Sequence, residues 1–118
     1  MHPLPRTITL QNVFDLAQQP DSVAWSPFRQ GVEIHWLYET APPGPAAALL
    51  RFQPGARVAL HQHTGFEHIL LLAGSQTDET GEHVRGALLI HPPGTRHSIA
   101  SAEGCVVLAI YEKPVEFV

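Results

Sequence analysis

Turn-forming residues divide this chain into short segments along most of its length. The 118 residues include 11 prolines and 9 glycines, and after Pro27 turn signals recur at intervals of roughly 8 to 12 residues. Between 32 and 38, apolar side chains occupy every second position, which is the period of a strand with one solvated face. Little helical periodicity accompanies this pattern, so the sequence predicts an all-β sandwich or barrel.

The remaining segments fit the same architecture. Further strands are expected at 47–52, 58–63, 67–73, 83–85, 87–91, 98–100 and 106–112, with a hairpin tip at 77–81. Ahead of the strands, residues 12–19 suit one or two helical turns with Asn12 as a candidate N-cap, and Pro20 ends them. We expect a single domain over 1–118, with an N-terminal arm over about 1–28 and a barrel core over about 31–112.

Composition narrows the classes of partner. The formal net charge is -4 and the 7 Lys and Arg residues are scattered, which argues against nucleic acid or a membrane surface as the partner. No apolar run approaches the roughly 18 residues that span a bilayer. Cys105 lies in an apolar segment and is expected to be a buried structural thiol, and Met1–Arg6 lacks the apolar run of a signal peptide. A cytoplasmic protein is therefore expected.

Two histidines and a glutamate lie close together between glycine turns. His61 and His63 are two residues apart, so on a strand they project from one face with Cα atoms roughly 6.6 Å apart. If the following bend returns the chain as a neighbouring strand, Glu67 presents a carboxylate across from them, and His97 completes the set after the Pro92–Gly94 turn. Three imidazoles and a carboxylate suit one divalent transition metal, Fe, Zn, Mn, Ni or Cu, with open positions for water or substrate.

Strand parity assigns other residues near this pattern. His68 follows Glu67 and is expected on the opposite face. Arg57 shares the parity of His61, so in a regular strand its guanidinium faces the metal side and would attract a carboxylate or enolate; the alternative is a solvent-facing residue at the barrel mouth. Three further histidines, expected to be structural or at the surface, are His35, His83 and His91. Candidates to line the barrel, with simple core packing as the alternative, are Trp36, Phe66, Ile69 and Leu71.

The pattern resembles two motifs of the cupin superfamily, in small single-domain members of the RmlC-like type. Positions that match the first motif are Gly55, His61, His63, Glu67 and Gly74, and those that match the second are Gly86, Pro92, Gly94 and His97. Ser101 stands where the second motif has asparagine, which is not a ligand in the family. The resemblance implies a double-stranded β-helix, the cupin jelly-roll barrel, with metal ligands His61, His63, Glu67 and His97. In some cupins the acid instead orients a ligand or a water molecule.

A closer resemblance is to the C-terminal cupin-like domain of the anti-sigma factor ChrR and to enzymes that cleave β-diketones. The matching segments are Trp25–Pro27, Leu49–Gly55 and Gly104–Cys105. These relatives imply a metal centre that binds a small organic ligand or substrate, with a dioxygenase as the first candidate. A metal-binding sensory module and a non-redox isomerase or lyase are the alternatives, and no general base is identified. The superfamily also implies a homodimer, and a cupin that stands alone is expected to carry no output domain of its own.

Overall fold

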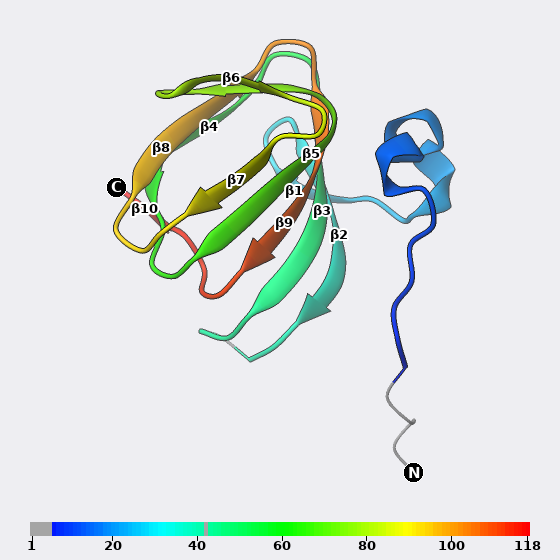
Figure 1. The fold of residues 1–118 in the computed structure, drawn as a ribbon, viewed down its shortest axis with the longest axis horizontal. Coiled ribbons are helices and arrows are strands. Elements are labelled where there is room, and N and C mark those ends of the chain that lie inside the picture. Colours follow the sequence, from blue (N-terminus) through cyan, green and yellow to red (C-terminus); the bar gives the residue numbers. More distant parts are fainter. Residues whose placement is uncertain (1–5, 42) are drawn as a thin grey trace.

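The computed structural model describes residues 6–41 and 43–118, and these form a curled antiparallel sheet that closes into a barrel (Figure 1). Two short 3-10 helices come first, η1 (Val13–Gln18) and η2 (Pro20–Ser22). The strands are β1 (Ser26–Arg29), β2 (Val32–Glu39), β3 (Ala46–Phe52), β4 (Ala56–Gln62), β5 (Glu67–Asp78), β6 (Gly81–Val84), β7 (Leu88–His91), β8 (Arg96–Ser101), β9 (Cys105–Tyr111) and β10 (Glu116–Phe117). The all-β barrel expected from the sequence is confirmed, while residues 1–5 of the expected arm lie outside the described residues.

Strand β5 joins the two layers of the barrel. Its first half, to Gly74, pairs with β9, and from Ser75 onward it pairs with β6 and, at Thr77, with β8. A register shift between Leu71 and Ala73 and a left-handed φ of 73° at Gly74 bend the strand between its two partners. The sequence predicted that this glycine would end the strand, but the ladder resumes beyond it, so β5 is longer than expected.

Apolar side chains fill the interior of the barrel. Residues at the centre of this core include Ile34, Leu50, Phe52, Val58, Ile69, Leu71 and Val107. The core-packing alternative is therefore confirmed for Ile69 and Leu71. For Trp36 and Phe66 an interior position is wrong, because these side chains are 39% and 42% exposed. Phe66 immediately precedes the inward-facing Glu67, and Trp36 adjoins a register shift of β2.

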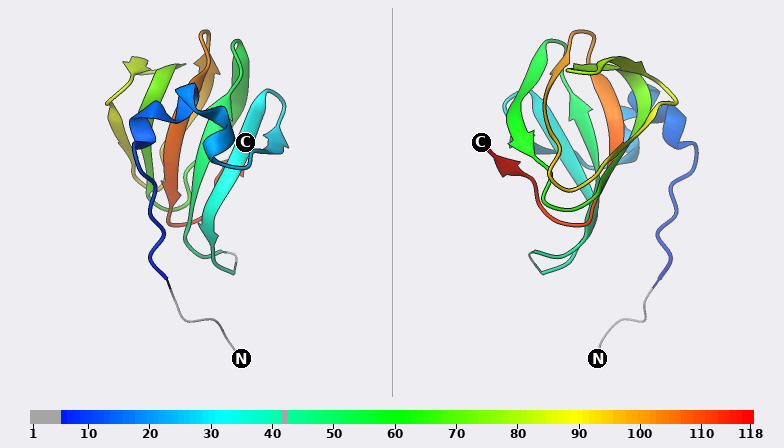
Figure 2. Two further views of the ribbon diagram at one scale, coloured as in Figure 1. Left: turned by 90° about the vertical axis from the view of Figure 1, so that its right-hand side faces the viewer. Right: turned by 60° about the vertical axis from the view of Figure 1, so that its left-hand side comes forward.

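A second apolar layer covers the outside of the sheet. The helix η1 lies against the outer face of β5 and β9 (Figure 2). Its Leu16 packs there with Leu49, Leu72 and Val106. Asn12 occupies the N-cap position of η1 with φ of 56°, but its side chain makes no capping hydrogen bond. Cys105 is buried, as expected. Among the described residues, no helix has the length and apolar character to cross a membrane.

Candidate metal centre

Four side chains bring possible metal-ligand atoms together at one end of the barrel. One nitrogen or carboxylate oxygen from each of His63, Glu67, His91 and His97 lies within 4.8 Å of all the others. His63, Glu67 and His97 are only 1%, 5% and 6% exposed, so water is largely excluded from them. The sequence predicted three of these residues together, and the structure adds His91 in the cluster.

Cross-strand pairing explains why residues distant in sequence converge here. Glu67 opens β5 and lies opposite His91, the last residue of β7. His61 in β4 lies opposite His97 in β8. His63 follows β4, and its backbone N–H donates to the Thr95 carbonyl at 2.9 Å. The site is therefore held by the sheet ladder itself, because side chains opposite each other on one face are close neighbours.

The ring of His63 is held in one orientation. Its Nδ1 lies 3.1 Å from the Thr95 carbonyl oxygen and 2.9 Å from Thr95 Oγ1, which in turn donates to the Pro92 carbonyl. An N–H at Nδ1 donates to these oxygens, so Nε2 carries the lone pair. That Nε2 lies 3.3 Å from Glu67 Oε1, and the ring stacks on His91 with centroids 4.5 Å apart and planes at 8°.

Three buried nitrogen atoms in the cluster have no hydrogen-bond partner among the described residues. They are Nε2 of His63, Nε2 of His91 and Nε2 of His97. Buried polar atoms without partners are costly, and native proteins almost always satisfy them. Converging imidazole nitrogens beside a carboxylate form a donor set that a divalent transition metal satisfies. The residues present therefore fit a metal ion.

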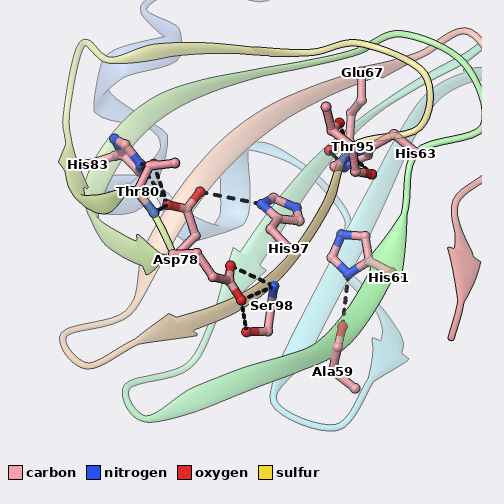
Figure 3. A network of polar contacts seen from close by, with 11 residues as sticks. Ala59, His61, His63, Glu67, Asp78, Thr80, His83, Thr95, His97 and Ser98 are labelled. Carbon is pink, nitrogen blue, oxygen red and sulfur yellow. Dashed lines mark hydrogen bonds and ion pairs between the residues drawn. The ribbon is translucent and has the colours of Figure 1, made fainter.

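The carboxylate of Asp78 contacts His97 at Nδ1, the ring nitrogen other than the Nε2 of the cluster. Its Oδ2 lies 3.4 Å from His97 Nδ1, while its Oδ1 accepts hydrogen bonds from Thr80 and lies 3.1 Å from His83 Nε2 (Figure 3). Burial by itself would raise the pKa of Asp78, but the bonds from Thr80, His83 and His97 hold that pKa well below its usual 3.8. The carboxylate thus stays ionised and favours an N–H at Nδ1 of His97. His83 has the structural role expected of it.

Asp78 shows what the sequence does not reveal. The segment 77–81 reads as a hairpin tip, and the contact from Asp78 to Thr80 is the local turn chemistry of such a tip. Nothing in that pattern indicates a contact with His97, which lies 19 positions away along the chain. The pairing of β5 with β8 at Thr77 and Ala100 creates the contact.

His61 is buried beside the cluster but is not one of its four closest members. Its ring centroid lies 4.5 Å from that of His97 and 5.3 Å from that of His63. Its Nδ1 donates to the Ala59 carbonyl at 2.9 Å, which leaves Nε2 as the lone-pair nitrogen. The assignment of His61 as a ligand remains a prediction.

Burial keeps several of these imidazoles in the neutral form that binds metals. Loss of hydration lowers the pKa of His61 and of His97 below 6.5. For His91, burial together with the neighbouring imidazoles of His97 and His63 lowers the pKa to about 4. His91 was expected to be structural or at the surface, since the Pro92–Gly94 turn breaks the parity between it and His97; pairing of β7 with β5 turns it inward instead.

A bulge in β4 settles the position of Arg57. Val58 pairs with Ile99 and His61 with His97, so three steps along β4 match two along β8. The extra residue reverses strand parity, and Arg57 is exposed on the side opposite His61. Of the two readings of Arg57, the solvent-facing one is therefore correct. The guanidinium that does lie near the site belongs to Arg29 in β1.

A small cavity adjoins the cluster inside the barrel. Its volume is about 50 Å³, enough for a few water molecules. Polar residues in its wall are Arg29, His61, Glu67, Gln76 and Tyr111, and the rest of the wall is mostly apolar. Burial, and then the nearby Glu67 carboxylate, raise the pKa of Tyr111. The phenol therefore stays protonated and can donate a hydrogen bond into the cavity.

Comparison with solved structures confirms the cupin barrel. A chain of the complex between Rhodobacter sphaeroides SigE and the anti-sigma factor ChrR is 26% identical, with a TM-score of 0.69 over 81% of this chain and 53% of that one. A putative acetylacetone dioxygenase from Methylibium petroleiphilum has a TM-score of 0.78 at 18% identity, over 100% of this chain and 85% of that one. An acetylacetone dioxygenase from Acinetobacter johnsonii has a TM-score of 0.76 at 14% identity, over 100% and 80%.

These comparisons differ in how much they show about this chain. The chain spans about half of the chain from the SigE complex, at 53%. At 18% and 14% identity, the two dioxygenase structures show a shared fold. No curated protein matches the chain in sequence. A family model described as the ChrR cupin-like domain matches residues 14–116. With that match over most of its length and the cupin barrel around its histidine cluster, the chain belongs to the ChrR cupin-like domain family.

Proposed function

We propose that this protein binds one divalent transition metal in the histidine cluster and, beside it, a small organic ligand or substrate. The observation that carries the proposal is the convergence of three buried Nε2 atoms, which accept or donate no hydrogen bond among the described residues, on the carboxylate of Glu67. Nitrogen and oxygen donors of this kind suit Fe, Zn, Mn, Ni or Cu. When bound, such a metal supplies Lewis acidity, or with iron the capacity to react with dioxygen.

The protein's own residues would prepare the site for the ion. Thr95 fixes the ring of His63, and Asp78 orients that of His97, so both present Nε2 to the cluster. Two ligand sets follow, one from the cupin motif and one from the geometry. Both contain His63, Glu67 and His97; the motif adds His61 and the geometry adds His91.

Metal analysis of variants separates these sets. Protein purified without chelator should contain about one transition metal per chain, and the His63→Ala/His97→Ala double variant should contain almost none. His68→Ala is the matched control, since His68 lies on the adjacent, opposite-facing position of β5. Single His61→Ala and His91→Ala variants then show which ring contributes to affinity. About one metal ion per chain in the double variant would contradict the proposed site.

An oxygen-dependent cleavage of a β-diketone is the first enzymatic candidate. It is supported by the two acetylacetone dioxygenase structures, whose likeness extends over the whole chain. Oxygen uptake should be measured with acetylacetone, aromatic diols and thiols after loading with each metal in turn. Uptake that requires both iron and a β-diketone supports a dioxygenase, and its absence with every metal and substrate contradicts one. Turnover without oxygen consumption would instead indicate an isomerase or lyase.

A sensory role is the second candidate. Its support is the family match to the ChrR cupin-like domain and the likeness to a chain of the SigE–ChrR complex. The helix η1 packs on the outer face of β5, the strand that begins with Glu67. A change at the site on metal binding could therefore alter the position of η1 at the surface. Hydrogen exchange of η1 should then change on metal binding; identical exchange with and without metal contradicts this role. Homodimer formation and a cytoplasmic location stay predictions, the first testable by sedimentation.

A further inference from the structure

A surface groove lies next to the cavity beside the metal cluster. The groove has a volume of about 250 Å³ and shares part of its wall with the cavity. The shared residues are Phe28, Arg29, Tyr111 and Val115. Further out, the groove is lined by Trp36, which packs edge-to-face on Phe28 with centroids 6.1 Å apart. A small molecule in this aromatic groove would therefore contact side chains that also form the wall of the cavity.

Arg29 places a positive charge at the junction of the groove and the cavity. Its guanidinium carbon lies 4.5 Å from the ring centroid of Phe28 and 4.5 Å from that of Phe117. Contacts with two aromatic rings restrict a side chain that otherwise has many rotamers. Within residues 6–41 and 43–118, no carboxylate forms a salt bridge with Arg29, so its N–H groups have no direct ion-pair partner there.

Tyr111 adds a second hydrogen-bond donor at the same junction. It is the cross-strand neighbour of Glu67, and it lines both the cavity and the groove. Its hydroxyl makes no hydrogen bond to any described residue, and a phenol is a hydrogen-bond donor at neutral pH. A planar guanidinium without an ion pair and a phenol O–H without a hydrogen bond, both counted among the described residues, suit the two oxygens of a carboxylate.

We propose that the junction of Arg29 and Tyr111 binds the carboxylate of a small organic acid whose apolar body lies in the groove against Phe28 and Trp36. This inference rests on the proposed function in taking the metal cluster as the adjoining site. The groove is slightly smaller than the roughly 300–1,000 Å³ of drug-sized sites, so the acid carries one ring or a short chain. Glu39 also lines the groove and disfavours a second anionic group on the ligand.

The binding test uses phenylacetate, benzoate and hexanoate as probes, with phenylacetamide as the neutral counterpart. Calorimetry gives the affinity, and fluorescence gives the location, because a Trp25→Phe background leaves Trp36 as the reporter in the groove. Trp25 itself lies on the other side of the sheet, under the Arg51 guanidinium. We expect quenching of Trp36 by at least one acid, with at least tenfold weaker binding of the amide.

Substitutions then assign the charge. Arg29→Gln should weaken acid binding at least tenfold while changing amide binding less than twofold, and Arg29→Lys should give an intermediate loss because it keeps charge without the planar fork. Arg57→Gln is the matched control, an exposed arginine outside the groove, and should bind like the original protein. Tyr111→Phe should weaken acid binding several-fold. Circular dichroism confirms that each variant is folded.

The outcomes separate this inference from the metal proposal. Acid binding that persists with chelator, or in the His63→Ala/His97→Ala variant, supports the Arg29 site even if no metal is found. A metal-loaded protein that binds none of the three acids up to about 10 mM overturns the inference and leaves the metal site standing. Equal affinity of Arg29→Gln and the original protein for the acids overturns it as well.

Discussion

Replacing His91 by phenylalanine should make the metal-free protein more stable while weakening its metal affinity. The imidazole is stacked face to face on His63, with centroids 4.5 Å apart, and its Nε2 is buried without a partner. Phenylalanine keeps an aromatic ring in that stack but removes the unpaired nitrogen. The substitution therefore separates the contribution of the ring to packing from that of the nitrogen to binding.

The magnitude follows from the buried nitrogen. A buried polar atom without a hydrogen bond costs roughly 1–3 kcal/mol, and an apolar group of the same shape removes that cost. We expect the free energy of unfolding to rise by about 1–2 kcal/mol in the presence of chelator, since the extra carbon of the ring costs part of the gain. Metal at a hundredfold excess over Kd stabilises the original protein by about 2.7 kcal/mol, and each tenfold loss of affinity removes about 1.4 kcal/mol of this.

The pH dependence has a defined sign. His91 has a pKa of about 4 in the folded protein and 6.5 in the unfolded chain, so between these values the unfolded chain binds the additional proton. This histidine thus lowers the stability of the metal-free protein as the pH falls from about 6.5 to 4. His91→Phe lacks that contribution, and its stability advantage should widen over the same interval.

Urea unfolding, followed by circular dichroism with chelator and with added zinc at pH 7 and pH 5, measures all three effects. His68→Phe is the control, because His68 lies on the opposite face of β5 and should leave metal stabilisation unchanged. A His91→Phe protein that is less stable than the original in chelator refutes the account of the unpaired nitrogen. Equal stabilisation of both proteins by zinc refutes a role of His91 in binding.

Three further changes test the framework around the site. Gly74→Ala should destabilise the protein by more than about 3 kcal/mol in thermal unfolding, because an added Cβ at φ of 73° would overlap the Gly104 carbonyl. The control Gly55→Ala, with φ of 84° and open space around it, should cost only about 1–2 kcal/mol. Equal losses of stability in the two variants would contradict this distinction. Asp78→Asn should weaken zinc binding about tenfold in a chelator competition, since it loses the charge behind His97, and unchanged affinity would remove its orienting role. Leu71→Ala should lower the free energy of unfolding by about 2–5 kcal/mol in urea, because Leu71 is fully buried in the barrel core; a loss below 1 kcal/mol would show that the core collapses around it.

The sequence by itself determined the architecture and most of the site. Local spacing carries this information: glycine and proline place the turns, and a period of two places alternate side chains on one face. The barrel was predictable for that reason, as was the convergence of His63, Glu67 and His97, which the structure brings together.

Only the tertiary structure decided which other side chains reach the cavity. Parity placed Arg57 beside His61, but the bulge in β4 reverses it, and a bulge depends on pairing with a partner strand. Pairing of β7 with β5 brought His91 into the cluster, as pairing of β5 with β8 brought Asp78 to His97. Register between strands distant in sequence is a property of the closed sheet, so local periodicity could not supply it.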